Sequence, residues 1–228
     1  GRGECGVTDR PPPRVLAFDV FGTVVDWFGS IAREVDCLRL GVPGADLARA
    51  WRAGYRPAMD RVRSGELPWT RIDDLHRMIL DELLARFGVA GLSEERKQHL
   101  NRVWHRLDPW PDAVPGLTRL RRRHALCTLS NGNVSLLVDM AKRAGLPWDC
   151  VLSAETFHAY KPDPETYLGA CRLLDVPPAE MMMVAAHRDD LAAARRRGHS
   201  AARHRHPQGQ GTRRGGPHER GGDEGADT

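Results

Sequence analysis

Short apolar runs alternate with segments of helical spacing over much of the chain. Residues 14–18, Arg-Val-Leu-Ala-Phe, form an apolar run that ends in Asp19 and a glycine-containing turn, which predicts a buried strand. Similar runs predict further strands, and apolar residues at helical spacing follow each of them. Repeated strand–helix units predict a parallel sheet with helices on both faces. The later strands are expected at 125–130, 150–153 and 181–185, and their helices at 133–144, 163–174 and 189–197.

The stretch 27–108 interrupts this alternation, because its signals are helical throughout. Helices are expected over about 31–40, 45–63 and 72–87, and a fourth begins after the N-cap residue Ser93. The sequence therefore predicts an α/β fold, a Rossmann-like doubly wound parallel sheet with an inserted helical cap domain. Such a sheet opens a cleft at the carboxyl ends of its strands.

These signals divide the chain into a core, a cap and two tails. The core is expected to comprise residues 14–26 and 109–197, and the cap residues 27–108. Residues 1–13 form a polar, Pro-rich leader that is expected to be disordered. Residues 198–228 are expected to form a disordered Arg/Gly-rich tail. No Val, Ile, Leu, Met, Phe, Trp, Tyr or Cys follows Leu191 in the last 37 residues, so little apolar burial would offset the entropy of ordering them.

Charge and composition narrow the function classes. The formal net charge of +4 resides in the tail, where residues 192–228 hold eight Arg against four acidic residues. Because this tail has no aromatic residue and the rest is neutral, a nucleic-acid-associated protein is the weaker alternative to an enzyme. No apolar run is long enough to span a bilayer, and the N-terminus lacks the apolar core of a signal peptide. The five cysteines are scattered and form no CxxC pair, which is typical of a reduced, cytoplasmic protein.

Polar side chains follow the predicted strands where a parallel sheet presents residues to a cleft. Asp19 ends the first strand, Ser130 and Asn131 end the second, Lys161 follows the third and Asp190 the last. Each alone is an ordinary turn or helix-start residue. Together they indicate a catalytic constellation of carboxylates, a hydroxyl and an ammonium group.

Four segments resemble the motifs of the haloacid dehalogenase superfamily: residues 18–23 (Phe-Asp-Val-Phe-Gly-Thr), 129–132 (Leu-Ser-Asn-Gly), 160–163 (Tyr-Lys-Pro-Asp) and the acid pair Asp189-Asp190. Most members are phosphatases, with a general acid two residues after the nucleophile and a magnesium-binding Gly-Asp pair. Here Phe21 and Ala185-Ala186 occupy those positions. These departures resemble the L-2-haloacid dehalogenase (type II) branch, which needs neither a metal nor another cofactor.

The resemblance implies hydrolytic dehalogenation of a short-chain (S)-2-haloacid to the (R)-2-hydroxyacid, through an aspartyl ester on Asp19. Its implied catalytic residues are Asp19, Lys161, Asp190 and Ser130. Asp189 is interpreted as a helix-start residue, and His187 stands where several members have asparagine. The residues implied to bind the substrate or halide are Phe21, Thr23, Arg52, Trp69, Asn131, Tyr167 and His187.

Two alternative functions remain compatible with the sequence. One alternative is a hydrolase that acts by the same mechanism on another small electrophile, such as a phosphate ester. A second is an inactive member, because residues 198–203, Gly-His-Ser-Ala-Ala-Arg, replace the apolar run of the family's final strand and that strand looks lost. Members are often dimers, so the resemblance also suggests a homodimer.

Overall fold

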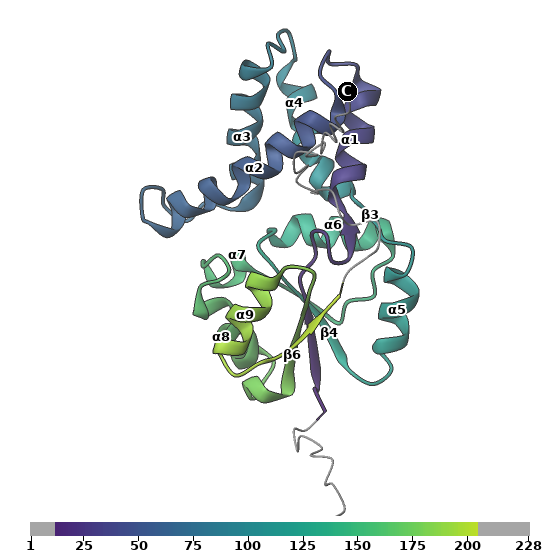
Figure 1. Ribbon diagram of the computed structural model, residues 1–228, viewed down its shortest axis with the longest axis vertical. Helices are drawn as coiled ribbons and strands as arrows, with labels where there is room; N and C mark the ends of the chain where they lie inside the picture. The colour runs from purple at the N-terminus through teal and green to yellow at the C-terminus, as the bar shows by residue number, and fades with distance from the viewer. Residues whose placement is uncertain (1–11, 205–228) are drawn as a thin grey trace, which may run out of the picture.

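The computed structural model describes residues 12–204, and its core is a parallel sheet of five strands in the order β5-β4-β1-β6-β7 (Figure 1). The central strand β1 pairs with β4 on one side and β6 on the other, with Phe18 opposite Thr128 and Val184. This agrees with the predicted α/β class. The strands are β1 Val15–Phe18, β4 Ala125–Ser130, β5 Cys150–Ser153, β6 Met181–Ala185 and β7 Ser200–Arg203.

Successive side chains of β1 point to opposite faces of the sheet, and each face carries its own apolar cluster. Leu16 and Phe18 belong to a cluster that includes residues of α5 and α6, whereas Val15 and Ala17 belong to one that includes residues of α8 and α9. The core is therefore doubly wound, as predicted. Its helices are α5 Ala113–Leu120, α6 Val134–Ala144, α7 Ala154–Phe157, α8 Pro164–Leu173 and α9 Arg188–Arg196, with the 3₁₀ turn η2 Pro178–Glu180.

A helical cap lies over the end of the sheet at which β1 terminates (Figure 1). The chain enters and leaves it through one antiparallel ribbon, in which β2 (Val25–Asp26) pairs with β3 (Asp108–Pro109). The predicted insertion over 27–108 thus has both ends at the same place on the core. Its elements are α1 Trp27–Leu38, α2 Gly44–Arg63, α3 Ile72–Arg86, α4 Glu94–Asn101 and the 3₁₀ helix η1 Arg102–Arg106.

Most predicted boundaries agree with the structure to within one or two residues. Helix α1 is the exception, because it begins at Trp27 rather than near residue 31. Asp26 is its N-cap, and the carboxylate accepts a hydrogen bond of 2.8 Å from the amide of Gly29. None of the helices in residues 12–204 is long and apolar enough to cross a membrane.

The prediction of a disordered tail from residue 198 onward is wrong for its first part. Residues 200–203 form β7, which pairs in parallel with β6 from Met182 opposite Ser200 to Ala185 opposite Arg203. The sheet's final strand is therefore present. Backbone hydrogen bonds need no large side chains, and Ser200 and the preceding His199 are buried. Residues 1–11 and 205–228, the rest of the predicted leader and tail, lie outside the described residues.

Candidate active site

Asp19 follows the last residue of β1 and faces the cap. Its amide donates a hydrogen bond of 2.9 Å to the carbonyl of Val184, which fixes the backbone beside β6. The Thr23 hydroxyl donates to Asp19 Oδ2 at 2.8 Å and accepts from the amide of Ala186 at 2.9 Å. The buried carboxylate is thus held in one orientation by groups from two neighbouring strand ends.

Lys161 joins Asp19 to the second predicted carboxylate. Its Nζ lies 3.2 Å from Asp19 Oδ1 and 2.5 Å from Asp190 Oδ2. The Tyr167 hydroxyl donates to the other oxygen of Asp190 at 2.5 Å. Asn131 fixes the lysine backbone, since its Oδ1 accepts from the amide of Lys161 at 2.8 Å. One ammonium group therefore bridges two carboxylates.

The charges in this cluster keep Asp19 ionised. Burial alone would raise the pKa of Asp19, but the charges of Lys161 and His187 and the hydrogen bond from Thr23 outweigh it and hold that pKa below its ordinary value. Burial would lower the pKa of Lys161, yet Asp190 and Asp19 raise it well above the usual range. The arrangement brings an ionised carboxylate, a balancing cation and a second carboxylate together in one place.

A cavity of about 280 Å³ lies above this cluster, between the cap helix α2 and the core. Lys161 and the carboxylates of Asp19 and Asp190 lie on its core side, and α2 contributes three arginines together with Tyr55, Met59 and Asp60. The cavity is lined by Asp19, Phe21, Arg52, Tyr55, Arg56, Met59, Asp60, Arg63, Asn131, Lys161, Pro162, Tyr167, His187, Asp189 and Asp190.

Arg52 places a cation against the aromatic side chains of the cap. Its Cζ lies 4.3 Å from the ring centroid of Tyr55 and 5.7 Å from that of Trp27. Its Nη1 is buried and has no hydrogen-bond partner among residues 12–204. A buried donor without a partner in a charged cavity wall is suited to an anion.

Three predicted site residues, Ser130, Trp69 and Thr23, do not line the cavity. Ser130 is fully buried, and its Oγ accepts from the amide of Gly132 at 3.1 Å. Trp69 stacks on His158, with the centroids 5.2 Å apart, and also packs against Tyr160. The apolar wall of the cavity is formed by other rings, including Phe21 and Tyr55.

The other predicted residues gather at the cavity. His187 is about half exposed, and its Nε2 lies 3.0 Å from the carbonyl oxygen of Phe21 and 3.6 Å from Asp19 Oδ2. Thr23 acts through its bond to Asp19 rather than by lining the wall. Those that line the cavity are Asp19, Phe21, Arg52, Asn131, Lys161, Tyr167, His187 and Asp190.

Several lining residues were not predicted from the sequence. Most lie on α2 three, four, seven, eight and eleven residues after Arg52, so they continue its helical face. That spacing is visible in the sequence, but it does not reveal which face of α2 covers the core. Asp189, interpreted as a helix-start residue, also lines the cavity. The α2 residues are Tyr55, Arg56, Met59, Asp60 and Arg63.

The side chains present do not fit a magnesium ion. Both oxygens of Asp19 are bonded, to Thr23 and Lys161, and both oxygens of Asp190 are bonded, to Lys161 and Tyr167. Mg²⁺ binds through one or two carboxylates with several waters, and here the Lys161 ammonium group already lies against both carboxylates. Within residues 12–204, no three His, Cys, Asp or Glu side chains come close enough to hold a metal ion.

The chain is similar to haloacid dehalogenases in both sequence and structure. The crystal structure of one L-2-haloacid dehalogenase is 48% identical to this chain, with a TM-score of 0.83, over 87% of each chain. That of a defluorinating L-2-haloacid dehalogenase is 40% identical, with a TM-score of 0.84, over 94% of this chain and 89% of the other. (S)-2-haloacid dehalogenase 4A of Burkholderia cepacia is 29% identical over 83% of this chain and 82% of its own. Phosphoglycolate phosphatases match as well, at 26% to 32% identity. The family model of haloacid dehalogenase-like hydrolases matches residues 13–198, and the chain therefore belongs to that family.

Proposed function

We propose that this enzyme hydrolyses short-chain (S)-2-haloacids to (R)-2-hydroxyacids through an ester on Asp19. The observation that carries the proposal is the Lys161 ammonium group bonded to both Asp19 and Asp190, beneath a cavity that also contains Arg52. In this proposal Asp19 is the nucleophile, Asp190 activates the water and Arg52 stabilises the departing anion.

In the first step an oxygen of Asp19 attacks the carbon that bears the halogen. The new carbon–oxygen bond forms as the carbon–halogen bond breaks, the centre inverts, and the halogen leaves with the bonding electrons as halide. Arg52, whose buried Nη1 has no partner among the described residues, and Asn131 stabilise the halide. The leaving group needs no proton, which is consistent with an apolar residue, Phe21, in the cavity wall.

In the second step water attacks the carbonyl carbon of the Asp19 ester. Asp190 accepts the proton of that water, while Lys161 and Tyr167 hold the Asp190 carboxylate in place. The bond between the Asp19 acyl carbon and the ester oxygen breaks, Asp190 returns its proton to that oxygen, and the second proton of the water passes to solvent. The hydroxyacid leaves, and the Asp19 carboxylate is regenerated.

Phosphate ester hydrolysis is the weaker alternative. Phe21 and Ala186 stand where the resemblance places a phosphatase's general acid and magnesium ligand. The amide of Ala186 donates a hydrogen bond to the Thr23 hydroxyl. The alcohol released from a phosphate ester needs a proton, and Phe21 has none to donate. The alternative of an inactive member with a lost strand has no further basis, because β7 is present.

The direct test is halide release from the two enantiomers of 2-chloropropionate, measured with an ion-selective electrode in excess chelator. We expect chloride from the (S) enantiomer alone, with (R)-lactate as product and no loss of rate in chelator. Chloride from neither enantiomer, or turnover that requires added Mg²⁺, would refute the proposal. A small phosphate monoester serves as the comparison substrate and is expected to release no phosphate.

A further inference from the structure

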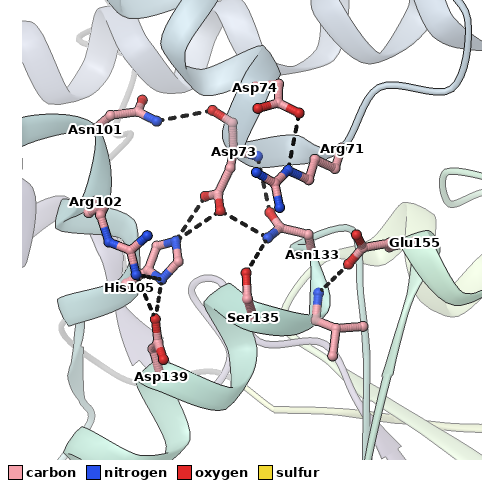
Figure 2. A network of polar contacts seen from close by, with 11 residues as sticks. Arg71, Asp73, Asp74, Asn101, Arg102, His105, Asn133, Ser135, Asp139 and Glu155 are labelled. Atoms are coloured by element: carbon pink, nitrogen blue, oxygen red, sulfur yellow. Dashed lines mark hydrogen bonds and ion pairs between the residues drawn. The ribbon is translucent and has the colours of Figure 1, made fainter. Parts of the chain in front are cut away.

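At the cap–core boundary, the N-terminus of the cap helix α3 is capped by a residue of the core (Figure 2). Asn133 is the N-cap residue of α6, yet its side chain does not cap that helix. Glu155 takes over this role and accepts from the amide of Val134 at 2.7 Å. Asn133 Oδ1 instead accepts at 3.0 Å from the amide of Asp73, in the first turn of α3. The N-cap residue of α3, Arg71, does not cap the helix with its own side chain. A core residue thus caps a helix of the cap domain.

The carboxylate of Asp73 in turn accepts a hydrogen bond from the Asn133 side chain, and it belongs to a buried polar network. Its Oδ2 accepts from Asn133 Nδ2 at 2.9 Å, and His105 Nε2 lies 3.0 Å from both carboxylate oxygens. His105 Nδ1 lies 2.7 Å from Asp139 Oδ2 on α6, and Asn101 Nδ2 donates to the Asp73 carbonyl. Asp73, His105 and Asn133 are all buried. Removing one partner from such a network leaves a buried polar group unpaired, which is strongly unfavourable.

On the core side, the network continues directly into the active-site loop 130–133. Asn131, two residues before Asn133, bonds the backbone of Lys161. The Gly132 carbonyl accepts from Ser153 Oγ, and a Cβ on Gly132 would lie only 3.1 Å from Phe21 Cζ. The loop therefore has little freedom to shift, and Asn133 is fixed relative to Lys161 and Phe21.

On the cap side, the network reaches Arg52 through α3. His76 lies one turn after Asp73, and its carbonyl accepts from Trp51 Nε1 on α2 at 3.0 Å. The two helices also touch closely, since a Cβ on Gly54 would lie 2.6 Å from Ile79 Cγ2. Because α2 is bonded to α3 beside Arg52, the position of α3 sets that of Arg52.

We propose that Asn133 and Asp73 are positioning residues that hold Arg52 of the cap in register with Asp19 of the core. This inference rests on the proposed function. The pair acts on the first chemical step, which uses Arg52 from the cap, and not on ester hydrolysis, which uses only Asp190, Lys161 and Tyr167 from the core. The cap–core ion pair of Arg63 and Asp163 is about one-third exposed and is screened by solvent, so it constrains the register less.

The test is single-turnover kinetics on (S)-2-chloropropionate, with chloride release reporting ester formation and hydroxyacid release reporting hydrolysis. In Asn133→Ala we expect ester formation to slow at least about tenfold, since misplacements of ~1 Å cost rate steeply, and hydrolysis to change less than about twofold. Asp74→Asn is the matched control. It breaks the exposed Arg71–Asp74 pair on the same helical turn and should leave both steps unchanged (Figure 2).

Exchanging the pair provides a rescue. Asp73→Asn combined with Asn133→Asp keeps a carboxylate facing an amide, so it should recover most of the rate lost in either single variant. Equal slowing of both steps in Asn133→Ala, or an exchange variant no faster than the single variants, would overturn the inference. If Asn133→Ala does not fold, the exchange variant compared with Asp73→Asn decides.

Hydrogen exchange separates this inference from the proposed function. Asn133→Ala should speed exchange in the first turns of α3 and in α2 around Arg52, whether or not chloride is released. Unchanged exchange there would contradict the coupling itself. Absence of chloride release by the wild-type enzyme would instead contradict the proposed function.

Discussion

At the scale of single residues, the site depends on one ammonium group between two carboxylates. Asp19 and Asp190 would repel each other if both were ionised without Lys161, which contacts both. Thr23 and Tyr167 each bond the remaining oxygen of one carboxylate, so the two acids differ in orientation and in neighbours. This difference suits one acid to attack carbon and the other to activate water.

The low pKa of Asp19 predicts how ester formation depends on pH. A carboxylate whose pKa is lowered in the folded state stays ionised below its ordinary value of 3.8, so the chloride burst should persist down to that range. The stability that this ionisation contributes is present above the unfolded pKa and is lost as pH falls through the folded one. Thr23→Val removes a hydrogen bond to the charged form and should move the acid limb of the burst to higher pH. Thr23→Ser keeps the hydroxyl and should not, and an unmoved limb in Thr23→Val would contradict this assignment.

Arg52 is expected to matter far more for catalysis than for stability. Arg52→Ala should slow ester formation by about 10²–10³-fold, the usual loss when a donor to developing negative charge is removed. The loss of its ring contacts should cost only about 1 kcal/mol of unfolding free energy. The control is Arg49→Ala. Arg49 is also on α2 and lies over an aromatic ring, that of Phe28 on α1, but it does not line the cavity. Burst kinetics and urea unfolding check both values, and a near-normal burst in Arg52→Ala would remove the residue from the site.

At the scale of elements, β7 completes the sheet beside β6. Ala202→Pro removes an amide hydrogen and constrains the strand, so it should lower the unfolding free energy by on the order of 2–3 kcal/mol. Ala202→Val adds a good strand former and should be close to neutral. Urea unfolding of the two variants measures the difference. Equal stability of both would indicate that β7 contributes nothing to the fold.

The sequence predicted elements well where side-chain pattern determines them. The four strands at 14–18, 125–130, 150–153 and 181–185 are apolar runs, and the structure has strands at or within those positions. Strand β7 could not be predicted in this way, because Ser200, Ala201 and Ala202 carry no apolar signal and the strand forms by backbone pairing with β6. The early start of α1 depends on one cap, Asp26, which pattern alone does not reveal.

At the scale of the whole molecule, the site lies where two units of the chain meet. The core's contribution was predictable, since parallel strands end at one edge of the sheet and bring Asp19, Asn131 and Asp190 together. The cap's contribution was harder to predict from the sequence. Arg52 was identified by resemblance. Its neighbours on α2, and the capping of α3 by Asn133, depend on how the cap packs against the core. That setting results from tertiary contacts and has no local signature in the sequence.

The central claim is that Asp19 itself becomes esterified, and oxygen-18 tests it most directly. In a single turnover in oxygen-18 water with enzyme in excess, water attacks the Asp19 carboxyl, so the label should enter Asp19 and the new hydroxyl of the product should remain unlabelled. Mass spectrometry of the peptide that contains Asp19 and of the product measures both. Asp19→Asn should abolish chloride release as well as turnover. Label found in the product alone, with none in Asp19, would contradict the covalent mechanism.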